Sequence, residues 1–227
     1  MQSMVRFSSA KHKARVSRFS LNYSFPPAWF YLLTSSETSA VTFGSEDRYD
    51  FKSTSHPFST VGLVSKSPSG SCTGTMVGPR HVLTATHCLT SDMTFTPGYN
   101  DGDAPFGTAR VSTYWKFSAW ERRSNDELYD DEVAFDYAVL ILDQRMGDYT
   151  GWMGVKDFSE SWKGGEYWDN IGYPDDIARN SRPVYSTGGS IWSVETYTRR
   201  ALNGKMYTGK VLGSFIDAGK VMSEVRQ

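Results

Sequence analysis

The chain has 227 residues, enough for one domain with a substantial core or for two small subdomains. Its 24 basic and 25 acidic side chains nearly cancel, so the charge balance gives no reason to expect a nucleic-acid partner. No run approaches the roughly 20 apolar residues that a membrane-spanning helix requires. We therefore expect a monomer whose partner is a protein or peptide substrate, with no membrane and no nucleic acid involved.

The first 44 residues are rich in serine and basic side chains and show no sustained periodicity. We interpret residues 1–44 as a disordered N-terminal extension, either a leader or a propeptide, and residues 45–227 as the domain. A basic stretch at 11–18 precedes a short apolar patch at 25–33 that prolines interrupt. This pattern is an incomplete match to a secretory signal.

From Ser45 onward, short apolar segments alternate with turn residues. Their lengths, their β-branched and aromatic content and their Gly, Pro, Ser or Asp boundaries are typical of strands in an all-β barrel or sandwich. The segments that we predict as strands are residues 61–64, 72–77, 82–85, 109–114, 137–142, 167–172 and 191–194.

Turn and helix signals complete the predicted secondary structure. Pro68-Ser69-Gly70 and Asn203-Gly204 each predict a hairpin turn. The acidic run 126–132 is interpreted as a solvated loop, because its spacing does not match an EF-hand calcium loop. Residues 215–225 are predicted to form one short helix.

Two cysteines, Cys72 and Cys88, lie 16 residues apart. A bridge between them would stabilise the fold by about 3 kcal/mol in the chain-entropy model, which favours an oxidising, extracellular compartment. Together with His81 and His87 they also supply the residue types of a zinc site. The spacing fits no common zinc pattern, and we expect His87 and Cys88 to point to opposite faces of a strand. The sequence therefore predicts neither a metal nor a cofactor.

His87 and Asp136 are the candidate catalytic residues. Hydrolysis of an amide by a hydroxyl nucleophile needs an imidazole as general base and a buried carboxylate that holds it in the right tautomer. His87 ends an apolar strand, and Asp136 precedes another strand 49 residues later. In the best-studied triad of this kind, the corresponding separation is about 45 residues. His81, at the start of the same strand as His87, is interpreted as a residue without a chemical role.

At these residues the chain resembles the trypsin-like (chymotrypsin-fold) serine proteases, and within them the secreted glutamyl-endopeptidase-like branch. The resemblance covers about residues 45–193. The motifs that carry it are Ser71-Cys72-Thr73-Gly74-Thr75, Val82-Leu83-Thr84-Ala85-Thr86-His87-Cys88, Asp136-Tyr137-Ala138-Val139-Leu140 and Asn170-Ile171-Gly172-Tyr173-Pro174.

The resemblance implies two six-stranded β-barrels with the active site between them, and peptide-bond hydrolysis by a serine endopeptidase. It implies that His87 and Asp136 both belong to the first barrel and that a disulfide joins Cys72 to Cys88. Residues 194–227 do not match the family, so we expect the second barrel to be incomplete or altered after about residue 193.

The nucleophilic serine of the family lies in a glycine-rich turn that also forms the oxyanion hole, and this sequence contains no such turn. The spacing in the best-studied triad places the serine near position 229. Ser190 follows two glycines and Ser214 follows one, but neither precedes a glycine. We therefore leave the nucleophile unassigned and expect the chain to be inactive. The alternative is a non-catalytic homologue that binds protein.

Overall fold

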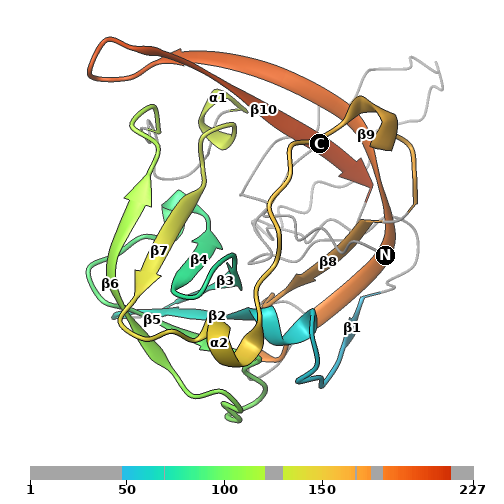
Figure 1. The fold of residues 1–227 in the computed structure, drawn as a ribbon. Coiled ribbons are helices and arrows are strands. Elements are labelled where there is room, and N and C mark those ends of the chain that lie inside the picture. The colour runs from blue at the N-terminus through green and yellow to red at the C-terminus, as the bar shows by residue number, and fades with distance from the viewer. Residues whose placement is uncertain (1–47, 69, 121–129, 167, 175–180, 216–227) are drawn as a thin grey trace, which may run out of the picture.

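The computed structural model describes residues 48–68, 70–120, 130–166, 168–174 and 181–215. Six strands close into a barrel in the order β2-β3-β4-β7-β6-β5, and each neighbouring pair is antiparallel (Figure 1). The barrel strands are β2 (Val61–Lys66), β3 (Ser71–Met76), β4 (His81–Thr84), β5 (Met93–Pro97), β6 (Ala109–Lys116) and β7 (Ala138–Leu142).

The interior of the barrel is filled around the ring of Phe95, which is fully buried. Gly62 and Gly74 face each other on β2 and β3. A Cβ added at Gly62 would lie 2.7 Å from the Phe95 ring, and one added at Gly74 would lie 3.1 Å from it. The two glycines therefore make room for one large aromatic side chain, which gives a small barrel a close-packed core.

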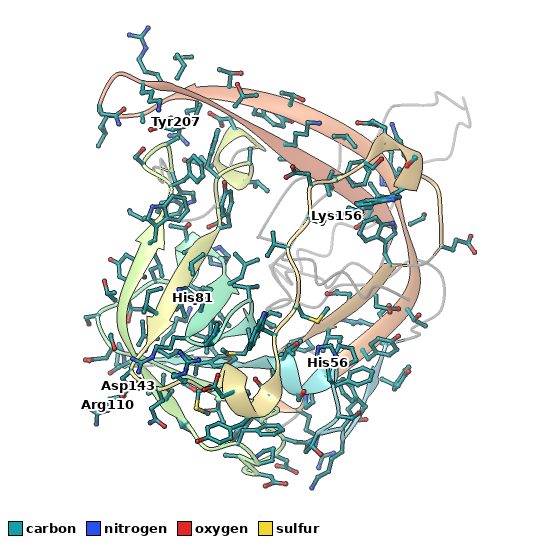
Figure 2. The ribbon with its side chains drawn as sticks, in the orientation of Figure 1. His56, His81, Arg110, Asp143, Lys156 and Tyr207 are labelled. Carbon is teal, nitrogen blue, oxygen red and sulfur yellow. A yellow bond between two sulfur atoms is a disulfide. The ribbon has the colours of Figure 1, made fainter. Side chains whose placement is uncertain are left out.

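At one end of the barrel, two hydrogen bonds join Arg110 of β6 to Asp143, the residue after β7. The backbone N–H of Arg110 donates to the Asp143 carboxylate at 2.9 Å, and the Asp143 N–H donates to the Arg110 carbonyl at 2.9 Å. Figure 2 shows the two side chains together at this end of the barrel. Such pairing satisfies backbone donors where the regular ladder stops.

A second, smaller sheet is built around the long strand β9 (Val184–Arg200). Its first part pairs with β1 (Tyr49–Asp50) and β8 (Trp168–Gly172), and the rest pairs with β10 (Met206–Phe215). In Figure 1 the β9–β10 hairpin arches over the end of the first barrel. Within the described residues, β10 pairs only with β9, so this sheet is partial.

The described helices are short: η1 (Phe58–Thr60), η2 (Thr86–Cys88), α1 (Asp130–Val133), α2 (Gly147–Thr150) and η3 (Glu160–Trp162). No helix among the described residues has the length and apolar character needed to cross a membrane.

An apolar cluster joins the second sheet to the first barrel. Ile171 and Tyr173, at the end of β8, pack against Val61 and Leu63 of β2. The Tyr173 hydroxyl donates to the carbonyl of Tyr99 at 2.9 Å. Burial raises the pKa of Tyr173, so this phenol stays neutral well into the alkaline range.

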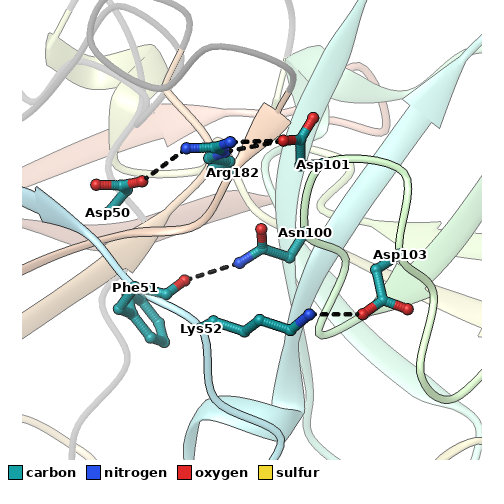
Figure 3. Close-up of polar contacts among 7 residues, drawn as sticks. All are labelled: Asp50, Phe51, Lys52, Asn100, Asp101, Asp103 and Arg182. Carbon is teal, nitrogen blue, oxygen red and sulfur yellow. Dashed lines mark hydrogen bonds and ion pairs between the residues drawn. The ribbon is translucent and has the colours of Figure 1, made fainter.

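Polar contacts at the surface extend this junction (Figure 3). The Arg182 guanidinium contacts Asp101 at 2.6 Å and Asp50 at 3.2 Å. The side-chain amide of Asn100 donates to the Phe51 carbonyl at 2.8 Å. The loop after β5 is therefore tied both to β1 and to the segment that enters β9.

The all-β fold and its two-part architecture are confirmed. Each segment predicted as a strand lies within or overlaps an observed strand. The hairpin turn at Asn203-Gly204 is present, with Gly204 at φ +78 and its N–H donating to the Ala201 carbonyl at 2.8 Å. The chain also reverses between β2 and β3, where the Lys66 N–H donates to Gly70, although Ser69 lies outside the described residues.

Several sequence predictions differ from the structure. Strand β5 was not predicted. The predicted helix at 215–225 is wrong at its start because Phe215 ends β10, and its other residues lie outside the described ones. The acidic run is not a solvated loop throughout, since residues 130–133 form α1 and Glu132 is fully buried. The N-terminal extension over residues 1–44 lies outside the described residues.

Candidate active site

His87 is held by a short 3₁₀ turn at the end of β4. The Cys88 N–H donates to the Ala85 carbonyl at 3.2 Å, and the Leu89 N–H donates to Thr86 at 3.0 Å. Because residues 86–88 form this turn, the expectation that His87 and Cys88 point to opposite faces of a strand is wrong. A disulfide joins Cys88 to Cys72 of β3 and so fixes the turn to the barrel wall.

Asp136 is presented by a second tight turn, just before β7. The Phe135 N–H donates to the Glu132 carbonyl at 3.0 Å, and the Asp136 N–H donates to Val133 at 3.1 Å. Strands β4 and β7 are antiparallel neighbours, with Thr84 opposite Ala138. The residues after β4 and those before β7 therefore lie at the same end of the barrel.

The two side chains meet in a two-point contact. His87 Nδ1 lies 2.6 Å from Asp136 Oδ2, and the backbone N–H of His87 donates to Asp136 Oδ1 at 2.8 Å. The Asp136 side chain is fully buried and the His87 side chain is 19% exposed. An ionised carboxylate only accepts hydrogen bonds, so we assign the proton of the neutral ring to Nδ1. Nε2 then carries the lone pair that can accept a proton.

Aromatic rings on both sides of Asp136 in the chain pack against Phe117. Phe135 is buried, and its ring and that of Tyr137 lie 5.7 and 5.2 Å from the Phe117 ring. Burial raises the pKa of Tyr137, so the phenol next to Asp136 in the chain adds no charge near neutral pH. A shielded carboxylate keeps its hydrogen bonds to His87 free of competition from water.

Cys72, His87 and Cys88 place their ligand atoms within 4.8 Å of one another. Both sulfurs are joined in the disulfide, so neither can bind a metal as a thiolate. This group does not fit a metal site, and His81, the fourth member of the zinc set considered from the sequence, is not part of it.

The two serines considered as nucleophiles lie in the strands of the long hairpin. Ser190 of β9 pairs with Phe215, and Ser214 of β10 pairs with Ile191. Neither serine occupies a glycine-rich turn, although backbone N–H groups of such a turn are what build an oxyanion hole.

Sequence reasoning missed the surroundings of Asp136. Glu132 was grouped with exposed acidic residues but is fully buried, and Arg199 lies near its carboxylate. One local signal was available, because Glu132 directly precedes the apolar residues Val133, Ala134 and Phe135. A glutamate is almost never fully buried unless it is paired, so its partner had to be known before burial could be predicted.

Three comparisons relate the sequence and the fold of this chain to known proteins. Residues 47–222 match the family described as trypsin. The chain is 32% identical over 163 residues to the glutamyl endopeptidase of Bacillus licheniformis, covering 68% of this chain and 48% of that protein. It is 31% identical over 167 residues to a Bacillus subtilis protein named extracellular metalloprotease, covering 68% of this chain and 50% of that protein. The chain thus spans about half the length of the curated relatives that it matches.

Among solved structures, a Glu endopeptidase in complex with MPD superposes with a TM-score of 0.58 at 18% identity, covering 80% of this chain and 95% of that one. The protease Anisep from Arthrobacter nicotinovorans superposes with a TM-score of 0.51 at 17% identity, covering 77% and 95%. At these identities the superpositions show a shared fold.

Proposed function

This chain belongs to the trypsin-like serine protease family, and on that premise we propose that His87 is the general base and acid of a serine endopeptidase site and that Asp136 orients it. The observation that carries the proposal is the two-point contact. One carboxylate accepts from both the ring Nδ1–H and the backbone N–H of His87.

The geometry suits proton transfer in two ways. The contact at Nδ1 leaves Nε2 of the neutral ring as the basic atom, which takes the hydroxyl proton of a nucleophile and later returns it to the leaving amine. The buried carboxylate also stabilises the imidazolium that forms in between. Removing the carboxylate therefore costs both orientation and charge stabilisation.

The proposed substrate is a protein or peptide, cleaved after glutamate. The support is the 32% identity to a protein named glutamyl endopeptidase. The second relative is named a metalloprotease, but in the part of the chain that the structure describes, the cluster around His87 has its sulfurs in a disulfide and does not fit a catalytic metal. The disulfide and the word extracellular in that relative's name support an extracellular location for this chain as well.

A second candidate is a non-catalytic homologue that binds protein through the barrel surface. One observation favours it: none of the serines of this sequence stands in a Gly-X-Ser-Gly turn. A serine hydrolase needs both a nucleophilic serine and an oxyanion hole, and removing them abolishes most catalysis even when the histidine and carboxylate remain.

A fluorophosphonate probe separates the two candidates, because it reacts only with an activated serine. The purified chain is treated with the probe alongside His87→Ala, Asp136→Asn and the matched control His81→Ala, whose side chain lies exposed on β4. Labelling that His87→Ala abolishes and His81→Ala preserves supports the endopeptidase, and peptide mapping identifies the serine. A folded chain that takes up no label contradicts it and favours the binding homologue.

A further inference from the structure

The β9–β10 hairpin reaches from the second sheet to the segment of the first barrel that carries Asp136. Helix α1, which precedes Asp136, contacts both strands of the hairpin. In Figure 1 the hairpin passes directly over α1, and Figure 2 shows Tyr207 of β10 at this place. Through this contact, the second sheet can influence the position of the Asp136 carboxylate.

Gly209 of β10 packs closely against Ala134. A Cβ added at Gly209 would lie 2.7 Å from the Ala134 carbonyl oxygen and 3.1 Å from the Ala134 Cβ. Real Cβ atoms do not come this close to a backbone oxygen, so only glycine lets β10 rest on this carbonyl. Ala134 stands two residues before Asp136, within the same turn.

A buried ion pair lies beside this contact. Arg199 Nη1 is 3.8 Å from Glu132 Oε1, with the side chains 11% and 0% exposed. A buried carboxylate needs a positive partner to offset its lost hydration. The Glu132 carbonyl also accepts the Phe135 N–H that shapes the Asp136 turn. The pair thus links the hairpin to the residue at which the turn begins.

Apolar contacts complete the junction. The Tyr207 ring of β10 lies 5.5 Å from the Phe117 ring in an edge-to-face arrangement, and Phe117 lies 5.7 Å from Phe135. Ala201, at the hairpin tip, is buried in the same cluster. The turn that presents Asp136 is therefore held by backbone contact, charge and aromatic packing at once.

We propose that the β9–β10 hairpin sets the position of Asp136, with Arg199 and Gly209 as positioning residues. The inference rests on the proposed function, since it assigns these residues to the orientation of the catalytic carboxylate. Both Asp136 oxygens are engaged by His87, so a small shift of the turn breaks one contact or the other. Misplacement by about 1 Å can cost a site about 100-fold in rate.

The test observes the contact directly and does not depend on a nucleophile. In the wild-type chain, we expect the His87 Nδ1 proton to give a far-downfield ¹H NMR signal and the His87 amide to be protected from hydrogen exchange by Asp136. In Arg199→Met we expect the signal to broaden or disappear and the amide to exchange at least about tenfold faster, a change of about 1.4 kcal/mol. Arg200→Met is the matched control, since Arg200 is exposed on the same strand.

A double variant that also removes the charge of Glu132 tests the same pair in a second way. Glu132→Gln/Arg199→Met removes the buried negative charge together with the positive charge that faces it, so we expect its His87 amide to exchange more slowly than that of Arg199→Met. Amides of the β2–β3 ladder serve as the reference for global stability, and we expect them to be unchanged in all these variants.

If Arg199→Met does not fold, Gly209→Ala answers the same question, with Gly154→Ala as its control because nothing lies within 4 Å of a Cβ at Gly154. The proposal is overturned if the downfield signal and the His87 exchange rate match wild type in a folded Arg199→Met or Gly209→Ala. Absence of probe labelling in the wild-type chain, by contrast, contradicts the endopeptidase function and leaves this NMR result standing.

Discussion

The first barrel and the second sheet differ in how their strands are paired. Every strand of the first barrel has two neighbours, whereas β10 of the second sheet pairs only with β9 among the described residues. The first barrel also holds the disulfide and the contact between His87 and Asp136. The closed barrel therefore carries both His87 and Asp136, while the role that we propose for the partial sheet is to align the two.

The largest expected loss of stability comes from a cavity in the core of the first barrel. Phe95→Ala is expected to cost about 3–5 kcal/mol, because the ring fills the space left by Gly62 and Gly74. Ile191→Ala in β9, equally buried, is expected to cost about 2–5 kcal/mol and to open the second sheet first.

Urea denaturation measures the loss in the free energy of unfolding of each variant, and native-state hydrogen exchange shows which strands open in it. We expect Phe95→Ala to speed exchange in both sheets and Ile191→Ala to leave the β2–β3 ladder protected. Equal loss of protection across both sheets in Ile191→Ala would show that they unfold as one unit. It would contradict the expected difference in stability between the first barrel and the second sheet.

Loss of the disulfide comes next. The Cys72→Ala/Cys88→Ala variant opens a loop of 16 residues, and we expect it to lower the free energy of unfolding by about 3 kcal/mol. Because the bridge holds the turn that carries His87, the amides of 86–88 are expected to lose protection before those of β9. Urea denaturation and hydrogen exchange measure the two effects. An unchanged free energy of unfolding would contradict the role given to the bridge.

Tyr173, at the junction between the two units, is expected to make the free energy of unfolding fall at alkaline pH. Burial raises the pKa of Tyr173 above the value of about 10 that it has in the unfolded chain. The folded state therefore holds a proton that the unfolded state releases. The contribution of protonated Tyr173 to the free energy of unfolding is fully present below about pH 10. It is lost as the pH rises further, by up to about 1.4 kcal/mol per pH unit.

Tyr173→Phe is expected to make this alkaline decline shallower while lowering stability near neutrality, because the hydrogen bond to Tyr99 is lost. Tyr137 and Tyr185, whose pKa values burial also raises, keep part of the slope. Thermal denaturation between pH 8 and about 11 makes the comparison. An identical slope in Tyr173→Phe would place the alkaline sensitivity elsewhere.

The smallest effect is expected at the surface of the same junction. Arg182→Ala removes the contacts to Asp50 and Asp101, which are solvent-exposed and screened by salt. We expect the melting temperature to stay close to that of wild type at physiological salt and to differ measurably only at low ionic strength. A large drop at both salt concentrations would mean that the polar contacts, and not the apolar cluster, join the two units.

The candidate pair could be predicted from sequence because its signal is local. His87 closely follows an apolar strand and stands beside a cysteine, Asp136 precedes another strand, and antiparallel pairing of these strands brings the two residues to one end of the barrel. Glu132 and Arg199 could not be paired in this way, since their contact depends on how far the hairpin arches across the barrel. Strand β5 was missed although Met93–Pro97 alternates apolar and polar residues, because the segment is only five residues long and ends in proline, which rarely stands inside a strand.

Asp136 is expected to hold the His87 ring with its proton on Nδ1, and ¹⁵N NMR of the ring reads that proton position. At a pH where the ring is neutral, we expect a protonated Nδ1 and an unprotonated Nε2 in wild type, with this preference lost in Asp136→Asn. A ring protonated on Nε2, or an equal mixture of the two tautomers in wild type, would contradict it.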